Sequence, residues 1–179
     1  MQNIGYNVFM SIIRDVTVKA RKYLKNEEIL LFIGPRQAGK TTVLKQLQLL
    51  LKKETPFFYL NLEDKEYLKL LNNNPKNIFQ IFPIDQTKKT TLFIDEVQYL
   101  NDPTNFLKLL FDQYKEKLKL IVSGSSAFYL DKKFHDSLAG RKKIFYVYTA
   151  SLREFLRFKK EDLLSKKHFD KLSLVEEEK

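Results

Sequence analysis

Residues 29–42 read Ile-Leu-Leu-Phe-Ile-Gly-Pro-Arg-Gln-Ala-Gly-Lys-Thr-Thr, an apolar run that leads into the pattern G-x-x-x-x-G-K-[ST]. The run Ile29–Ile33 is short and continuous and stops at Gly34, which predicts a buried strand of a parallel sheet. Residues 40–53 have their apolar side chains on one face, which predicts a helix. The pattern therefore lies between a strand and a helix, the context that a phosphate-binding loop requires.

Phosphate binding explains the residue types in this loop. Backbone N–H groups of the loop and of the first helical turn can surround phosphate oxygens, and a side chain at Gly39 would obstruct their approach. Lys40 adds a positive charge at the β- and γ-phosphates, and the Thr41 hydroxyl is a typical ligand of Mg²⁺. Arg36 could face the nucleotide, a neighbouring subunit or water. We expect a nucleotide phosphate site made of Gly34, Pro35, Arg36, Gln37, Ala38, Gly39, Lys40, Thr41 and Thr42.

The chain around this loop alternates strand-like and helical segments. Further strands are predicted at 57–62, 91–94, 118–122 and 144–148, and helices at 8–23, 64–71, 77–82 and 104–114. A last helix is expected from Ser151 onward, where Ser151 and Glu154 fit a capping box. The aromatic residues 57–59 are expected in the core. Strands separated by helices favour right-handed crossovers and an α/β fold whose parallel sheet has helices on both faces.

Two adjacent acids end the predicted strand Leu92-Phe93-Ile94-Asp95-Glu96. This position corresponds to the sheet edge at which such folds bind ligands. We expect Asp95 to hold Mg²⁺ through a water and Glu96 to orient and deprotonate an attacking water. A water-activating acid argues against a phosphotransferase that acts on a small molecule. The pattern Asn-Lys-x-Asp, typical of guanine specificity, is absent from the sequence.

Two further segments leave alternatives open. Residues 120–126 run from a strand into small hydroxyl residues, so Ser123 or Ser125 could contact the γ-phosphate or the attacking water, or the hydroxyls could cap the next helix. Spacing does not choose between the two serines. Arg141 follows Gly140 and is either an arginine finger or a surface residue that begins a strand. The candidate catalytic residues are Lys40, Glu96, Ser123, Ser125 and Arg141.

Composition narrows the class of protein. The 179 residues include 32 Lys and Arg against 22 Asp and Glu, a formal net charge of +10. Of these basic residues 26 are lysines, some of them in Lys-Lys pairs scattered along the chain, so a nucleic-acid surface and a solvated lysine surface both stay open. The lack of cysteine excludes disulfides, thiolate zinc sites and cysteine nucleophiles. Every apolar stretch falls short of the roughly 18 residues that cross a bilayer, so we expect a cytoplasmic protein with no membrane partner.

Several motifs occur together in this order: residues 34–42, Phe-Ile-Asp-Glu-Val-Gln at 93–98, Ser-Gly-Ser-Ser at 123–126, Leu-Ala-Gly-Arg at 138–141 and Ser-Leu-Arg-Glu-Phe at 151–155. Over about residues 5–158 the combination resembles the bacterial and archaeal AAA-type P-loop ATPases related to the archaeal ATPase group. In that group an ATP-binding domain is usually followed by a C-terminal domain of unknown function.

The resemblance implies a P-loop NTPase fold of the AAA/ASCE type with a five-stranded parallel sheet in the order 5-1-4-3-2. By position, Lys40 corresponds to the phosphate-binding residue, Thr41 and Asp95 to the metal site, and Glu96 to the second acid. A serine at 123 or 125 is sensor-like, and Arg141 is finger-like. The implied ligands are ATP, ADP and Mg²⁺.

The implied function is binding and hydrolysis of Mg-ATP, with the nucleotide state switching conformation or partner binding. A protein partner or a second copy of the chain could supply an arginine. The alternative is a nucleotide-dependent DNA- or protein-binding module with little or no turnover. We expect an N-terminal helical segment at 1–28 packed on the core, the ATPase core at 29–150, and a helical extension at 151–179. Because family members usually continue well beyond this point, the extension is expected to be a truncated lid.

Overall fold

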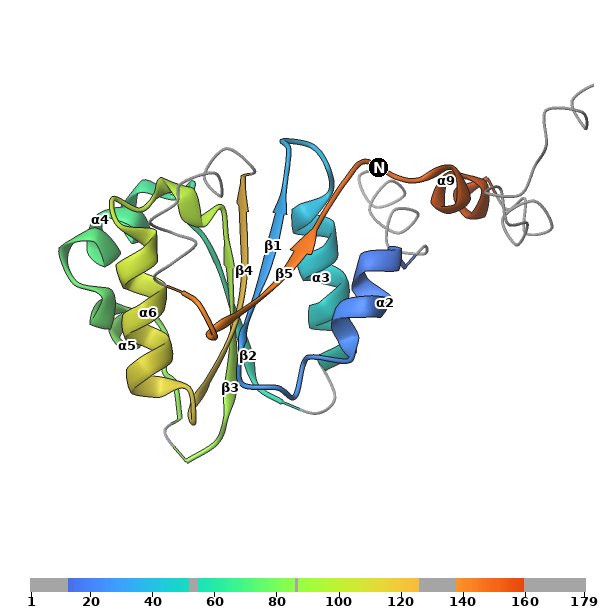
Figure 1. The fold of residues 1–179 in the computed structure, drawn as a ribbon. Helices are drawn as coiled ribbons and strands as arrows, with labels where there is room; N and C mark the ends of the chain where they lie inside the picture. The colour runs from blue at the N-terminus through green and yellow to red at the C-terminus, as the bar shows by residue number, and fades with distance from the viewer. Residues whose placement is uncertain (1–12, 52–54, 86, 126–137, 160–179) are drawn as a thin grey trace, which may run out of the picture. The chain divides into compact units, whose positions relative to one another are not determined.

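A computed structural model describes residues 13–51, 55–85, 87–125 and 138–159 (Figure 1). Contacts divide the chain into two units, Asp15–Thr149 and a second unit of Met1–Arg14 with Ala150–Lys179. Part of the expected N-terminal helix and most of the expected C-terminal extension lie outside the described residues. The predicted division into three parts therefore stays a prediction.

The unit Asp15–Thr149 is built on one parallel sheet. Its strands are paired in the order β2-β3-β4-β1-β5, which is the expected order 5-1-4-3-2 read from the opposite edge. The prediction of an α/β P-loop sheet is thus confirmed. The strands are β1 (Ile29–Gly34), β2 (Phe57–Asn61), β3 (Thr90–Asp95), β4 (Leu118–Ser125) and β5 (Lys142–Tyr146).

Helices cover both faces of this sheet, as Figure 1 shows. One face carries α2 (Asp15–Arg21) and α3 (Lys40–Leu51). The other carries α4 (Lys65–Asn73), α5 (Ile78–Ile81) and α6 (Pro103–Tyr114), with the short 3₁₀ turns η1 (Pro75–Asn77) and η2 (Val97–Tyr99). Side-chain caps begin two of these helices, because Asp64 accepts from Glu66 N and Asp102 accepts from Asn105 N.

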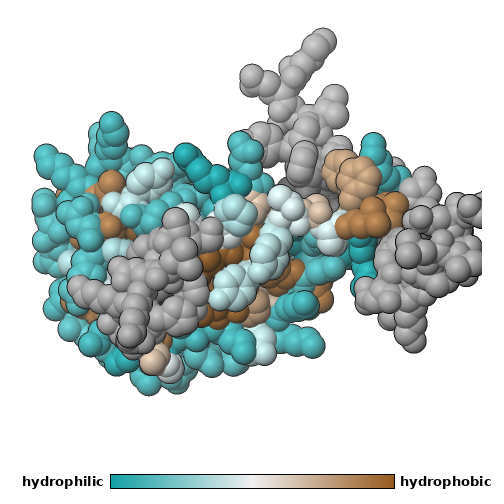
Figure 2. All heavy atoms as spheres, turned by 45° about the horizontal axis from the view of Figure 1, so that its top comes forward, coloured by the Kyte–Doolittle hydropathy of each residue, from teal (hydrophilic) through white to brown (hydrophobic). Residues whose placement is uncertain are grey.

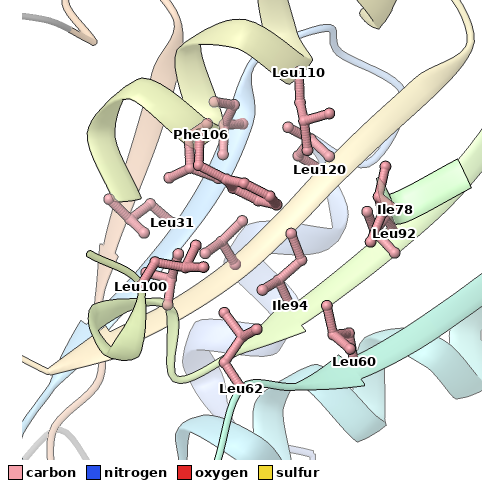
Figure 3. Close-up of a cluster of buried hydrophobic side chains, with 14 of the residues drawn as sticks. Leu31, Leu60, Leu62, Ile78, Leu92, Ile94, Leu100, Phe106, Leu110 and Leu120 are labelled. Carbon is pink, nitrogen blue, oxygen red and sulfur yellow. The ribbon is translucent and has the colours of Figure 1, made fainter. Parts of the chain in front are cut away.

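Strand alternation decides which side chains meet which helices. Leu92 and Ile94 of β3 belong to the core under α6, whereas Phe93 belongs to the core under α3. Figure 3 shows Phe106 of α6 directed towards the strand residues of the core under α6. Because successive strand residues point to opposite faces, Asp95 projects to the same face as Phe93. The acid at the end of β3 therefore lies on the α3 side of the sheet.

β4 is longer than the predicted strand 118–122. It continues through Ser123 and Gly124 to Ser125, which pairs with Gly34 at the end of β1. Ser123 is fully buried, and its hydroxyl donates to Asp95 Oδ1 and accepts from Glu96 N. The pattern of small residues suggested a turn, but pairing with β1 keeps the segment extended.

The second unit contains α9 (Leu152–Phe158). The predicted capping box is confirmed: Ser151 Oγ accepts from Glu154 N at 3.2 Å, and a carboxylate oxygen of Glu154 accepts from Ser151 N at 2.9 Å. Within the same unit Arg14 Nε lies 3.0 Å from Glu154 Oε1. The capping carboxylate is thus held at two points.

The described surface is largely hydrophilic in the view of Figure 2, with apolar side chains visible between polar ones. Among residues 13–51, 55–85, 87–125 and 138–159, no helix is long and apolar enough to cross a membrane.

Candidate functional site

The loop between β1 and α3 contains two residues with left-handed backbone. Gln37 has φ 62° and Gly39 has φ 91°. Left-handed residues in such a loop turn successive N–H groups towards one point, and α3 adds the free N–H groups of its first turn. α3 has 12 residues, so its N-terminus carries a substantial part of a helix dipole. This geometry suits an anion with several oxygens, such as a nucleotide phosphate.

Gly34 has a packing role that the motif does not reveal. A Cβ atom at this position would lie 2.0 Å from the carbonyl oxygen of Val147. Val147 N donates to Ile33 O at 2.7 Å, which holds the chain after β5 against the end of β1. A side chain at residue 34 would therefore collide with backbone before any ligand is considered.

Lys40 is 4% exposed and lies at the first position of α3. Its Nζ donates to the carbonyl oxygens of Gly34 at 3.2 Å and Pro35 at 3.1 Å. The same Nζ lies 3.7 Å from Glu96 Oε1. The ammonium group thus connects the loop after β1 with the acidic pair at the end of β3.

Asp95 is 1% exposed and accepts hydrogen bonds from three hydroxyl groups. Thr41 Oγ1 and Tyr59 OH donate to its Oδ2 at 2.6 and 2.8 Å, and Ser123 Oγ donates to its Oδ1. These donors come from α3, β2 and β4, so the carboxylate joins three elements. Hydrogen bonds to an ionised acceptor are stronger than neutral ones, which stabilises the buried charge.

The Tyr59 hydroxyl is strongly perturbed by this position. Burial raises its pKa above the ordinary value, and the negative charge of Asp95 and the hydrogen bond to it raise the pKa further. Smaller contributions in the same direction come from the charges of Glu63 and Glu96. Tyr59 therefore stays protonated and acts as a donor to Asp95.

The residues that converge here fit a magnesium ion. The Thr41 hydroxyl and the Asp95 carboxylate are 2.6 Å apart, and both are oxygen donors of the kind that Mg²⁺ prefers. Within the described part of the chain, no group of three or more His, Cys, Asp or Glu residues could hold a metal by itself. A magnesium site with one or two protein ligands takes its other ligands from phosphates and waters.

Glu96 follows Asp95 in left-handed backbone, with φ 60° and ψ 47°. Its N–H donates to Ser123 Oγ at 3.0 Å, and its carbonyl accepts from Tyr99 N at 3.2 Å. Its carboxylate Oε2 accepts a hydrogen bond from Gln98 Nε2. Strand alternation therefore does not set the direction of this side chain; the turn after β3 and its hydrogen bonds do.

The other predicted site residues are placed differently. Ser123 contacts both acids through its hydroxyl, whereas Ser125 contributes its backbone N–H, which donates to Gln98 Oε1 at 3.1 Å. Which serine acts as a sensor stays a prediction. The loop residues differ in solvent exposure: exposed are Pro35, Arg36 and Gln37, buried is Ala38, and partly exposed are Gly39, Thr41 and Thr42.

Arg141 lies at the other end of the sheet. Its carbonyl accepts from the N–H of Ile29, the first residue of β1, at 2.8 Å. The phosphate loop follows Gly34, the last residue of β1, and therefore lies at the opposite end of that strand. The guanidinium of Arg141 forms two hydrogen bonds with Asp112, at 2.7 and 3.2 Å, and these lower the pKa of that carboxyl. The structure therefore does not bring Arg141 to the loop of its own chain. A finger role for this arginine could act only on another molecule.

Sequence reasoning did not identify Tyr59 or Gln98 as site residues. Tyr59 was expected in the core. Its ring does pack against the core under α3, but its hydroxyl donates to Asp95. The contact depends on β2 lying next to β3, which local sequence does not reveal. Gln98 follows the acidic pair by two residues, and this proximity was the available signal.

Comparisons with known proteins place the chain in a family. A family model described as an AAA domain matches residues 26–156. An uncharacterized protein of Methanocaldococcus jannaschii is 30% identical over 149 residues, which are 82% of this chain and 31% of the relative. The match thus spans about a third of that relative's length.

Solved structures share the fold. RIF2 of Saccharomyces cerevisiae has a TM-score of 0.60 at 12% identity, covering 95% of this chain and 68% of that one. The ORC1 protein of Aeropyrum pernix, solved in complex with DNA, has a TM-score of 0.55 at 15% identity, covering 87% of this chain and 53% of that one. At these identities the likeness concerns the fold alone. The family match, together with the loop and the sheet order, shows that this chain belongs to the AAA domain family of P-loop ATPases.

Proposed function

We propose that this chain binds Mg-ATP at residues 34–42 and hydrolyses it, and that the nucleotide state changes its conformation or its affinity for a partner. One observation carries the proposal: Thr41 Oγ1 donates to Asp95 Oδ2 at 2.6 Å. This bond joins the phosphate loop to the acidic pair. The contact of 3.7 Å between Lys40 and Glu96 supports it.

The roles follow from position and chemistry. The loop amides and Lys40 bind the β- and γ-phosphates, and Thr41 and Asp95 hold the metal. Mg²⁺, when bound, neutralises charge on the phosphate oxygens. Glu96 accepts a proton from a water whose oxygen attacks the γ-phosphorus. The bond from that phosphorus to the bridging oxygen breaks, and ADP and inorganic phosphate leave.

The binding step is tested by Lys40→Ala. Loss of a charge-assisted contact of about 1.5–3 kcal/mol weakens binding by about 10- to 100-fold. Calorimetry with ATP and with ADP, in the presence of Mg²⁺, measures this change. Lys108→Ala is the matched control, because Lys108 is an exposed lysine of α6. A folded wild-type chain that binds neither nucleotide contradicts the proposal.

The chemical step is tested by Glu96→Gln. The substitution keeps the size of the side chain and removes the base, so nucleotide binding persists while turnover falls by about 10²- to 10⁴-fold. Phosphate release under saturating ATP measures the rate, and Glu116→Gln, at an exposed glutamate, is the control. An unchanged rate in Glu96→Gln would show that another group activates the water.

Turnover by the chain alone is expected to be slow, because an arginine supplied in trans can contribute about 10³ to 10⁵ in rate. A second copy that supplies it makes the specific activity rise with protein concentration. A constant specific activity across a concentration series leaves a different protein as the source of the arginine.

A second candidate function is nucleotide-dependent binding of DNA. A cavity of about 400 Å³ lies at the end of the sheet opposite the phosphate loop. Leucines and cationic side chains from three segments line it. These cations are Arg21, Lys22, Lys25, Lys89 and Lys119. The net charge of +10 supports attraction of a phosphate backbone.

A salt series distinguishes this candidate. Labelled duplex DNA is expected to bind more weakly as salt rises, and the double variant Lys25→Glu with Lys89→Glu reduces both affinity and salt slope. The double variant Lys69→Glu with Lys108→Glu, at exposed lysines of α4 and α6, is the control with the same change of net charge. If DNA does not bind at about 50 mM salt with or without ATP, this candidate is wrong.

A further inference from the structure

Gln98 has hydrogen bonds at both ends of its side chain. Its Nε2 donates to Glu96 Oε2, and its Oε1 accepts from Ser125 N at 3.1 Å. Gln98 belongs to η2, the turn directly after the acidic pair, whereas Ser125 is the last residue of β4. The amide therefore links the carboxylate of Glu96 to the end of the neighbouring strand.

The Gln98 amide can make both contacts in one orientation only. A carboxylate accepts and does not donate, and a backbone N–H donates and does not accept. If the amide were turned over, its oxygen would face the Glu96 carboxylate and its NH₂ group would face the Ser125 N–H. Both contacts would be repulsive, so the network determines the assignment. Glutamate at this position could satisfy Ser125 alone, and methionine could satisfy neither partner.

The hydrogen bond from Gln98 matters because the backbone leaves the Glu96 carboxylate underdetermined. The Glu96 N–H is fixed by Ser123 at 3.0 Å, which holds the main chain. The carboxylate itself lies 3.7 Å from Lys40, too far for a hydrogen bond. Gln98 supplies the hydrogen bond that gives this carboxylate a direction.

We propose that Gln98 is a positioning residue that orients the Glu96 carboxylate for activation of water and ties its orientation to the end of β4. This role rests on the proposed function, in which Glu96 is the base. Through the Ser125 amide, a shift of the end of β4 changes the direction of the carboxylate. β4 also carries Ser123, so one strand contacts both acids.

Two substitutions at residue 98 separate the hydrogen bond to Glu96 from the hydrogen bond to Ser125. Gln98→Glu keeps an oxygen for Ser125 N and removes the donor to Glu96. Gln98→Met keeps the length of the side chain and removes both contacts. Gln113→Met is the matched control, because Gln113 is exposed on α6. Urea unfolding of each variant measures whether the fold is retained.

Three readouts test the role, and only the third is expected to differ between the two variants. Mg-ATP affinity by calorimetry stays within about twofold of wild type for both. Turnover at saturating ATP falls by about 10- to 100-fold in both, the range for loss of an outer partner of a site, with KM little changed. Hydrogen exchange of the Ser125 amide accelerates in Gln98→Met and stays slow in Gln98→Glu, with the Val122 amide as an internal reference within β4.

The outcomes are distinguishable. If the wild-type chain turns over ATP and either Gln98 variant turns over at the wild-type rate, Gln98 is a structural residue and the positioning role is wrong. If both variants lose affinity and turnover together, Gln98 shapes the binding site as a whole, which also overturns the role. If the wild-type chain turns over no ATP, the proposed function fails and this role fails with it.

Discussion

At the scale of single residues, the candidate site depends on hydroxyl groups that surround one carboxylate. Thr41, Tyr59 and Ser123 all donate to Asp95, and each comes from a different element. The first two share Oδ2, so removal of either changes the same oxygen that would face a metal. Tyr59 is the most informative of the three, because its hydroxyl has no counterpart in the phosphate-loop motif.

Tyr59→Phe is expected to weaken magnesium binding without removing nucleotide binding. The variant keeps the ring that packs against the core under α3 and loses only the donor that fixes the Asp95 carboxylate. Loss of such an outer partner costs about 10- to 100-fold in metal affinity. A titration of Mg²⁺ at fixed ADP, followed by calorimetry, measures the shift.

Tyr67→Phe on α4 serves as the control, because this tyrosine is 37% exposed and lies on the other face of the sheet. An unchanged Mg²⁺ dependence in Tyr59→Phe would mean that Thr41 and Ser123 are sufficient to orient the carboxylate.

Residues 34–42 and the pair Asp95–Glu96 were predictable because each is contiguous in the sequence and follows an apolar strand. Tyr59 and Gln98 were not, because their contacts arise from strand pairing and from the turn after β3. Local patterns identify the groups that carry charge. They do not identify the neutral groups that orient those charges.

At the scale of elements, the ends of β1 and β5 determine how the phosphate loop begins. The backbone after β5 approaches Gly34 so closely that a Cβ atom there would lie 2.0 Å from Val147 O. At Gly140, which precedes Arg141 at the opposite end of the sheet, no atom of the described residues lies within 4 Å of a Cβ, but φ is +73°. The two glycines are therefore needed for different physical reasons.

Gly34→Ala is expected to destabilise the protein by about 1–3 kcal/mol through overpacking, and to weaken ATP binding because the loop must move away from β5. Gly140→Ala is expected to cost about 1 kcal/mol through left-handed strain and to leave ATP binding unchanged. Urea unfolding and calorimetry of both variants measure these effects. Equal losses of nucleotide affinity in the two variants would contradict the local role of Gly34.

Element boundaries were predictable to within a few residues where a cap or a proline marks them, as at Asp102 and Pro103 before α6. The end of β4 was not, because Gly124 and Ser125 favour a turn by composition. They are extended here because Ser125 pairs with Gly34 of the neighbouring strand β1. Tertiary pairing overrides the local preference of small residues in this strand.

At the scale of the whole sheet, alternating periodicity indicated a parallel α/β fold, but the strand order came from the resemblance to a family. Nothing local in residues 57–62 or 144–148 says that these strands are the two edges. The order matters for function because it puts β4 beside β1 and β3 next to β4. Asp95 and Ser123 thereby meet the loop that follows Gly34.

The opposite end of the sheet is held by a buried lysine. Lys119 of β4 is 2% exposed, and its Nζ donates to the carbonyl oxygens of Tyr23, Asn26 and Glu28 at 3.1, 2.6 and 2.6 Å. These carbonyls belong to the connection between α2 and β1. One ammonium group therefore fastens that connection to the centre of the sheet.

This lysine predicts a pH dependence of stability. Burial lowers the pKa of Lys119 from 10.5 to about 8, with an opposing contribution from Glu28 and a further lowering by Lys89. Between these two values the unfolded chain binds more protons than the folded chain, so the contribution of Lys119 to the free energy of unfolding rises with pH. Below about pH 8 the full cost of burying the charge is present. At about 1.4 kcal/mol per pKa unit, the increase is at most about 3.5 kcal/mol.

The measurement compares wild type with Lys119→Met by urea unfolding at several pH values from 7 to 11. Other groups that titrate in this range cancel in the difference, so the stability of wild type relative to the variant is expected to rise between about pH 8 and 10.5. Lys108→Met, at an exposed lysine of α6, is the control substitution. A flat difference for Lys119→Met would mean that the three carbonyl contacts offset burial, so that the ammonium group is as stable in the fold as in water.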